Sequence, residues 1–308
     1  MTPDEFTNQE FYLDVGDGHQ LYVQDWGNKK ARLPIIYLHG GPGDGCGDRD
    51  KRNYDPRKHR VIFHDQRGSG KSLPFGSLKH NSTPELVEDI ETLAASLNLT
   101  RFILVGGSWG STLALAYGVT HPGRIAGMVL NGVFTATKAE LDWFTRGGWQ
   151  EFFPEVWQEF LEATPAKHQQ NPLEYHLQQG LSSDSEAAKQ SAYAFANMEL
   201  GLLKLDDHYT AGKLEDFDPT SIFIQLHYNR NQFFLREGHI LRHAGKLQMP
   251  VYLIAGRYDM VTPPVTAYNL AEALPDAEIV WTINGHIRQH EAKNIQTLLV
   301  NRLVEDSQ

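Results

Sequence analysis

Residues 106–110 read Gly-Gly-Ser-Trp-Gly, and this pentapeptide constrains the fold more than any other feature of the chain. An apolar run at 101–105 precedes it, and a segment with helical spacing of apolar residues at 111–119 follows it. A serine flanked in this way predicts a sharp turn from a strand into a helix, which leaves the Ser108 hydroxyl exposed above a sheet. Because such turns join strands to covering helices, we expect an α/β fold.

The remainder of the chain repeats this alternation of strand and helix signals. Apolar runs bounded by Gly, Pro or polar residues are typical of strands buried on both faces of a parallel sheet. They cover residues 34–38, 61–63, 101–105, 125–130, 251–255 and 278–283, and helical patterns cover 86–97, 111–119 and 291–304. Two further runs flank Gly16-Asp17-Gly18 and predict an N-terminal hairpin. The sequence therefore predicts a mostly parallel, doubly wound sheet.

The alternation stops between about residues 135 and 246. This stretch is rich in aromatic residues and helix formers, and it separates the first six apolar runs from the last two. We expect a core made of residues 1–134 and 247–308, with residues 135–246 inserted as a mainly helical cap.

Composition excludes several classes of function. A net charge of −10 disfavours a nucleic-acid partner, because phosphate binding needs clustered Lys and Arg. No run approaches the roughly 20 apolar residues of a membrane helix, so no membrane association is expected. The histidines lack metal-ligand spacing, so we expect neither a metal nor another cofactor. A single cysteine, Cys46, and the absence of a visible secretory signal favour the cytoplasm. The oligomeric state is not predicted.

Serine is a poor nucleophile at neutral pH and needs a histidine as base, oriented by a carboxylate. In folds with this turn, the acid follows the serine in the chain and the histidine follows the acid. Asp259 comes just after the run 251–255, and His286 comes just after the run 278–283. His290 is the rival base, near the start of the last helix. Asp276 is a weaker rival acid, because it precedes a strand.

An acyl-transfer site also needs two hydrogen-bond donors for the oxyanion. The amide after the nucleophile, that of Trp109, is the first candidate. The glycine-rich loop after the run 34–38 supplies the second, and we expect it to be the amide of Gly41.

Several motifs together resemble the proline iminopeptidases (prolyl aminopeptidases), a family of α/β-hydrolases. They are His39-Gly-Gly-Pro-Gly43, Asp65-Gln-Arg-Gly-Ser-Gly70-Lys-Ser72, Gly106-Gly-Ser-Trp-Gly-Ser-Thr-Leu-Ala-Leu115, Phe152-Phe-Pro-Glu155-Val-Trp157, His227-Tyr228, Gly256-Arg-Tyr-Asp259 and Gly285-His286. They span nearly the whole chain. The resemblance implies an α/β-hydrolase fold with a helical cap and release of an N-terminal proline from peptides.

The resemblance also implies roles for residues of the substrate site. By motif position, Glu199 is the cap carboxylate that holds the free amine of the substrate, and Phe134 and Phe144 line the pocket for the proline ring. The chain departs from the family where Gln225 replaces a second acidic residue and Asn229 replaces an aromatic one.

We therefore expect a serine exopeptidase that releases an N-terminal proline, or a small apolar residue, through an acyl-enzyme. Its partner is a small peptide or another small molecule. The departures at Gln225 and Asn229 leave open an esterase or amidase acting on small acyl substrates. A non-catalytic binding protein on the same fold is the third alternative, because a fold does not fix a function.

Overall fold

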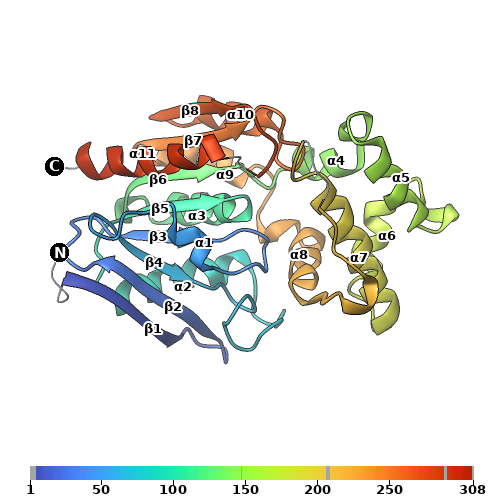
Figure 1. Ribbon diagram of the computed structural model, residues 1–308, viewed down its shortest axis with the longest axis horizontal. Helices are drawn as coiled ribbons and strands as arrows, with labels where there is room; N and C mark the ends of the chain where they lie inside the picture. The colour runs from blue at the N-terminus through green and yellow to red at the C-terminus, as the bar shows by residue number, and fades with distance from the viewer. Residues whose placement is uncertain (1–4, 147, 206–208, 288–289, 307–308) are drawn as a thin grey trace.

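A single mixed sheet forms the centre of the molecule (Figure 1). The computed structural model describes residues 5–146, 148–205, 209–287 and 290–306. Over these residues the sheet has eight strands in the order β1-β2-β4-β3-β5-β6-β7-β8. The strands are β1 (Phe6–Asp14), β2 (Gln20–Asn28), β3 (Ile35–Leu38), β4 (Arg60–His64), β5 (Phe102–Gly107), β6 (Ile125–Asn131), β7 (Val251–Gly256) and β8 (Ala277–Thr282).

The strand pairing confirms the predicted fold class. β3 to β8 are parallel to one another, whereas β1 and β2 form a hairpin whose second strand pairs antiparallel with β4. The hairpin turns through Gly16 and Gly18, which both have positive φ, a conformation that glycine adopts without steric cost. The parallel strands all end at the same edge, and ligand sites of such sheets lie at that edge.

Both faces of β3 to β7 are buried, as their continuous apolar runs predicted, whereas the edge strand β8 is mostly half-buried. In β3, β4 and β5, alternate residues enter opposite hydrophobic clusters: Ile36, Ile62 and Leu104 on one face, and Ile35, Val61 and Ile103 on the other. The first cluster also holds side chains of α2 (Thr83–Ser96), α3 (Trp109–Thr120) and α10 (Pro264–Ala273). The second holds side chains of α11 (His290–Asp306). The sheet is therefore covered by helices on both sides.

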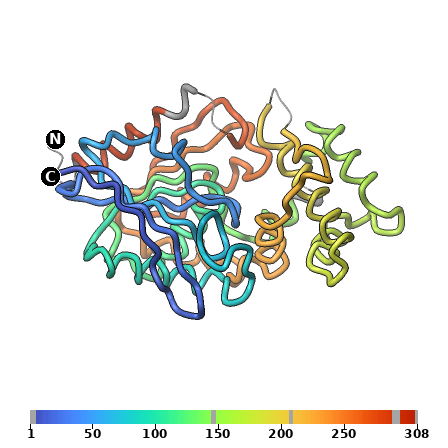
Figure 2. Tube along the Cα trace, turned by 60° about the horizontal axis from the view of Figure 1, so that its bottom comes forward, coloured from blue at the N-terminus to red at the C-terminus, as the bar shows by residue number. Residues whose placement is uncertain are grey.

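The chain between β6 and β7 is mainly helical, and its helices up to residue 230 lie beyond one end of the sheet in both views (Figures 1 and 2). Its helices include α4 (Lys138–Arg146), α5 (Pro154–Glu162), α6 (Pro172–Gln179), α7 (Ser185–Gly201), α8 (Thr220–Arg230) and α9 (His239–His243). Side chains of α5, α6, α7 and α8 share a hydrophobic cluster of their own.

The last part of this segment packs on the core. Phe233, Ile240 and Leu247 belong to the same cluster as Trp109 of α3. The cap boundaries at residues 135 and 246 stay a prediction. Helix α8 packs on both clusters, because Ile224 and Tyr228 belong to the core cluster and Leu226 belongs to the cap cluster.

Candidate active site

Ser108 occupies a strained turn between β5 and α3. Its φ of 53° and ψ of −127° lie in a region that residues other than glycine rarely adopt. The two flanking glycines are required by close backbone contacts: a Cβ on Gly106 would lie 2.3 Å from the Gly110 oxygen, and a Cβ on Gly110 would lie 2.1 Å from the Leu38 oxygen. A Cβ on Gly107 would meet nothing closer than 3.8 Å. The turn therefore needs glycine at two positions and leaves the third free.

His286 and Asp259 form a hydrogen-bonded pair after the ends of β8 and β7. Nδ1 of His286 lies 2.8 Å from Oδ2 of Asp259. The other carboxylate oxygen accepts the amides of Val261 and Thr262, and the Thr262 hydroxyl donates to Oδ2 at 2.8 Å. These donors fix the position of the carboxylate, which accepts a hydrogen bond from Nδ1–H of His286 and so holds the imidazole in that tautomer. Nε2 is then left as the acceptor that a general base requires.

The charges around His286 also favour its role as a general base. Removal from water lowers the pKa of the His286 imidazole, but the carboxylates that face it outweigh this effect, and the pKa is raised above its ordinary value. Those carboxylates are Asp259, Glu199 and Asp44. The described contacts include no hydrogen bond between Ser108 and His286, and in many enzymes this bond tightens only when substrate binds.

Gln66 links the two segments that carry the candidate oxyanion donors. Its amide donates to Nε2 of His39 and its side-chain nitrogen donates to the His39 carbonyl, both at 3.0 Å. Its side-chain oxygen accepts the indole N–H of Trp109 at 2.8 Å. The loop that carries Gly41 is thereby tied to the first residue of α3, whose own amide has no partner within the helix.

One cavity of about 1380 Å³ brings most of the predicted site residues together. We call it the Ser108 cavity, and its lining includes Gly41, Ser108, Glu199, Gln225 and His286. The core contributes the glycine-rich loop and the strand ends, and α7 and α8 contribute the opposite wall. Nucleophile, base and cap residues thus face the same space.

Glu199 of α7 and Gln225 of α8 interact on the cap wall of the cavity. Removal from water and the negative charge of Asp44 raise the pKa of Glu199 to about 7, against smaller opposing effects of His286 and of a hydrogen bond with Gln225. Gln225 is only 6% exposed. Within the part of the chain that the structure describes, its Oε1 has no hydrogen-bond partner. A buried acceptor of this kind calls for a donor, and a ligand could supply it.

Asn81 fixes the position of α8 on the core through two hydrogen bonds. Its carbonyl lies 3.1 Å from Nε2 of His227, and its Oδ1 accepts the Tyr228 hydroxyl at 2.9 Å. The Tyr228 ring packs on Trp109 with a centroid distance of 4.9 Å. The His-Tyr pair of the resemblance is therefore a structural anchor, and it fixes where Gln225 enters the cavity.

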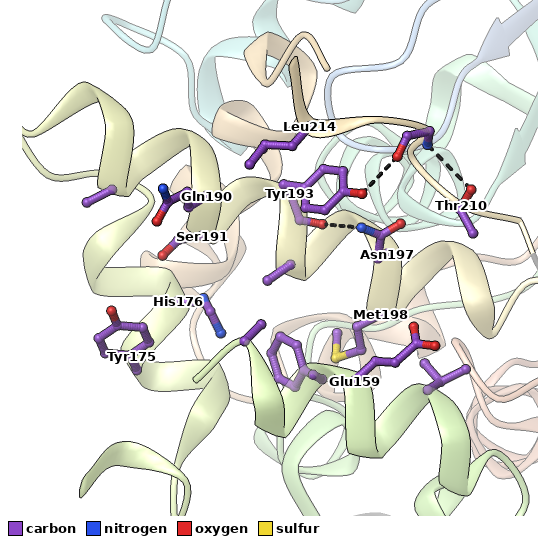
Figure 3. Close-up of a pocket in the computed structure, with 16 residues that line it drawn as sticks. Glu159, Tyr175, His176, Gln190, Ser191, Tyr193, Asn197, Met198, Thr210 and Leu214 are labelled. Atoms are coloured by element: carbon purple, nitrogen blue, oxygen red, sulfur yellow. Dashed lines mark hydrogen bonds between the residues drawn. The ribbon is translucent and has the colours of Figure 1, made fainter. Parts of the chain in front are cut away.

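A second cavity, of about 490 Å³, lies within the cap (Figure 3). Helices α5, α6 and α7 surround it with side chains that include Glu159, Tyr175, His176, Tyr193 and Asn197. None of the predicted site residues lines it. Helix α7 thus presents Tyr193 and Asn197 to this cavity, and Glu199 to the Ser108 cavity.

Comparison with known proteins assigns the chain to a family. Residues 34–293 match the family model described as the alpha/beta hydrolase fold. A proline iminopeptidase of Xylella fastidiosa is 38% identical over 298 residues, which cover 93% of each chain. One from Arabidopsis thaliana is 37% identical, over 94% of this chain and 78% of its own. The chain belongs to the proline iminopeptidase family of α/β hydrolases.

Solved structures agree with the fold of this family. The proline iminopeptidase of Mycobacterium smegmatis superposes with a TM-score of 0.64 and 19% identity, over 97% of this chain and 100% of its own. An esterase from Exiguobacterium antarcticum superposes with a TM-score of 0.67 and 17% identity, over 96% and 100%. At such identities the likeness concerns the fold alone.

The structure places Phe134, one of the two phenylalanines of the expected proline pocket, apart from Glu199. Phe134 is buried in the core, edge-on to Phe233 at a centroid distance of 4.8 Å, and it is not among the residues that line the Ser108 cavity. The side chain of Phe144 lies outside the described residues. Both roles stay predictions that rest on the family resemblance.

The rival acid, Asp276, lies away from the site. Asp276 is exposed and precedes β8, at the opposite end of that strand from the cavity. His290 begins α11, as expected, and its side chain lies outside the described residues. No group of metal-ligating side chains occurs in the part of the chain that the structure describes.

No helix among the described residues combines the length and the apolar character that crossing a bilayer demands.

Three site residues were missed in the sequence. Thr262 follows the candidate acid and donates to it, and a hydroxyl three residues after Asp259 was the available signal. Gln66 lies in the motif Asp65–Ser72. The spacing of residues in the sequence could not predict that it contacts both segments that carry the candidate oxyanion donors. Asp44 lies in the glycine-rich loop and lines the Ser108 cavity.

Proposed function

We propose that the chain is a serine exopeptidase that releases an N-terminal proline, or a small apolar residue, from peptides. Ser108 attacks the carbonyl of the first residue while His286 accepts the hydroxyl proton. Asp259 holds the imidazole in the tautomer that this step requires. The amides of Gly41 and Trp109 stabilise the oxyanion of the tetrahedral intermediate.

The reaction then continues in two steps with the same base. His286 returns the proton to the leaving amine, so that the shortened peptide departs and an acyl-enzyme remains on Ser108. His286 next deprotonates a water molecule, which hydrolyses the ester and frees the amino acid.

The observation that carries this proposal is the position of Glu199 in the Ser108 cavity. A partly buried carboxylate, hydrogen-bonded by Gln225, faces the same space as Ser108 and His286. A cationic amine next to the scissile carbonyl can pair with it, whereas a blocked amine cannot. This arrangement favours substrates with a free N-terminus.

Apolar side chains line another part of the cavity. They are Leu200, Leu203, Phe217, Ile222 and Val261. A small apolar side chain or a pyrrolidine ring would be removed from water against them. The resemblance adds Phe134 and Phe144 to this proposed pocket.

A panel of substrates tests the amine requirement. It compares prolyl, alanyl and N-acetylprolyl anilides with short p-nitrophenyl esters, on the unchanged chain and on Glu199→Gln. We expect Glu199→Gln to lower kcat/KM for free-amine anilides by about a hundredfold, because an ammonium would lose its buried partner. Hydrolysis of the esters should change little.

Glu159→Gln is the matched control, because Glu159 lies in the cap but lines the other cavity. It removes the same charge and should alter neither substrate class. Equal hydrolysis of free and blocked anilides by the unchanged chain would contradict the exopeptidase proposal.

An esterase or amidase acting on small acyl groups is the second candidate. The raised pKa of Glu199, about 7, favours it, because a substantial fraction of the carboxyl groups is then neutral near neutral pH. A neutral cavity wall suits an uncharged substrate. Similar turnover of prolyl and N-acetylprolyl anilides, unaffected by Glu199→Gln, would support this candidate.

We also propose that the enzyme acts in the cytoplasm on small peptides. In support, Cys46 is a free thiol that donates to the His64 carbonyl, and removal from water raises its pKa well above the ordinary value. The thiol therefore stays protonated and unreactive.

A further inference from the structure

The amine site of the cavity has one carboxylate fewer on its cap wall than the family resemblance leads one to expect. Gln225 stands where the second acid is usual. Its amide nitrogen is used by the hydrogen bond to Glu199, and its Oε1 is buried without a partner among the described residues. A secondary ammonium has two N–H donors and a full positive charge. Glu199 and this Oε1 can accept both protons, but only Glu199 supplies a charge.

A second carboxylate enters the same space from the core wall. Asp44 belongs to the glycine-rich loop after β3 and lines the Ser108 cavity. Its Oδ2 lies 3.4 Å from the point where a Cβ on Gly40 would stand, and Cβ of Ser108 lies 3.5 Å from the same point. Asp44 is therefore close to the nucleophile.

The negative charge of Asp44 also affects ionisable groups elsewhere around the cavity, including Glu199 on the cap wall. Its charge opposes ionisation of Glu199 and favours protonation of His286. Two carboxylates that repel each other across a cavity are stabilised together when a cation binds between them. Gln225 lines the same cavity, and its buried Oε1 is an acceptor that a donor of that cation would satisfy.

We propose that Asp44 is a specificity-determining residue, the second carboxylate that binds the free amine of the substrate, in place of the acid absent at Gln225. This proposal rests on the exopeptidase function proposed above. Glu199 and Gln225 bind the ammonium from the cap, and Asp44 binds it from the loop that also carries Gly41. Recognition of the amine is thus shared between both walls of the cavity.

Asp44→Asn tests this role, with Asp48→Asn as the matched control. Asp44 and Asp48 are both exposed, but Asp48 lies four residues further along the chain, at the start of α1 (Asp48–Lys51), and is not among the residues that line the cavity. For prolyl anilide we expect Asp44→Asn to raise KM about tenfold and to change kcat less than about threefold, because uniform binding is lost. Because Asp44 also raises the pKa of His286, hydrolysis of p-nitrophenyl acetate is compared at a pH where His286 is neutral in both proteins, and it should stay unchanged there. Asp48→Asn should behave like the unchanged chain.

Inhibition of ester hydrolysis gives a second measurement that needs no peptide turnover. Pyrrolidine is a cation and should inhibit competitively, with an inhibition constant about tenfold higher in Asp44→Asn. Cyclopentanol, which is neutral, should inhibit both proteins equally.

Two results would overturn the role of Asp44. One is an unchanged KM for prolyl anilide and an unchanged inhibition constant for pyrrolidine. The other is an equal loss for anilide and ester, which would mean that Asp44 acts through His286 or the loop. Failure of the exopeptidase function is distinguishable from both, because the unchanged chain would then hydrolyse esters without any preference for a free amine.

Discussion

The two walls of the Ser108 cavity are built in different ways. On the core wall, Ser108, Asp259 and His286 each follow the end of a parallel strand, and backbone contacts determine where they lie. On the cap wall, Glu199 and Gln225 project from two helices that lie outside the sheet. The core wall therefore holds its groups rigidly, whereas the cap wall places long side chains through the packing of helices.

This difference suggests a division of labour between chemistry and selectivity. Attack, proton transfer and oxyanion binding need reacting atoms held within narrow limits, which strand ends provide. Recognition of an amine needs charge in a partly dry space, which cap residues can provide with looser geometry. Changes at Ser108, Asp259 or His286 should thus affect every substrate, whereas changes at the cap residues, or at Asp44 in the loop of the core wall, should affect only some.

The largest expected effect is that of Ser108→Ala. Without the nucleophile no acyl-enzyme forms, so kcat/KM should fall by about 10⁴- to 10⁶-fold for prolyl anilide and p-nitrophenyl acetate alike. Steady-state rates on both substrates measure this, and labelling by a fluorophosphonate should be lost in parallel. Retention of most activity on either substrate would remove Ser108 from its role.

Asp259→Asn should come next, with a loss of about 10⁴-fold in kcat on both substrates. An asparagine amide can donate to Nδ1 of His286, which would move the imidazole proton to Nε2 and leave no base for Ser108. Asp276→Asn is the control, since Asp276 is an exposed carboxylate before β8. A similar loss in both variants, or in neither, would contradict the assignment of Asp259.

The core wall was predictable from the sequence because its chemistry demands fixed residue types next to strand ends. Buried parallel strands appear as apolar runs, and the residues just after them must lie at one edge of the sheet. That logic paired Asp259 with His286 without any knowledge of the cap, and in the structure the two are hydrogen-bonded, with His286 lining the Ser108 cavity. The hairpin and the covering helices followed from turn residues and helical spacing in the same way.

The cap wall was less predictable, because nothing in the spacing of its residues shows which face of a helix meets the core. Glu199 came from family resemblance rather than from a pattern. On the core wall, a role for Asp44 was not predictable from the sequence either, since an aspartate among loop glycines is ordinary turn composition. Phe134 shows the limit of resemblance, because the described packing places it against Phe233 in the core.

The pH dependence of log kcat/KM should differ by about one unit of slope between substrates that use the amine site and substrates that do not. His286 must be neutral to act as a base, and its pKa is raised, so activity on every substrate should fall as the pH drops through that value. Amine binding also needs ionised Glu199, whose pKa is about 7. Plots of log kcat/KM should therefore rise with a slope near one for the ester and near two for prolyl anilide.

Glu199→Gln is the control for this profile. It removes one ionisation, so the slope for prolyl anilide should return to about one. It also removes a carboxylate that faces His286, so the limb for the ester should move to lower pH. Identical slopes for both substrates in the unchanged chain would mean that Glu199 does not bind the amine.

Gln225→Glu should give the smallest effect and is the most direct test of the cap wall. It replaces the amide that donates to Glu199 with a second carboxylate, so the two acids would share a proton and the pKa of Glu199 would rise further. Above neutral pH, when both acids are ionised, KM for prolyl anilide should fall about threefold, because the ammonium gains a charged partner. Below neutral pH the shared proton should cancel this gain. A change in ester hydrolysis of the same size would show that residue 225 acts on the core wall, and the division between the walls would fail.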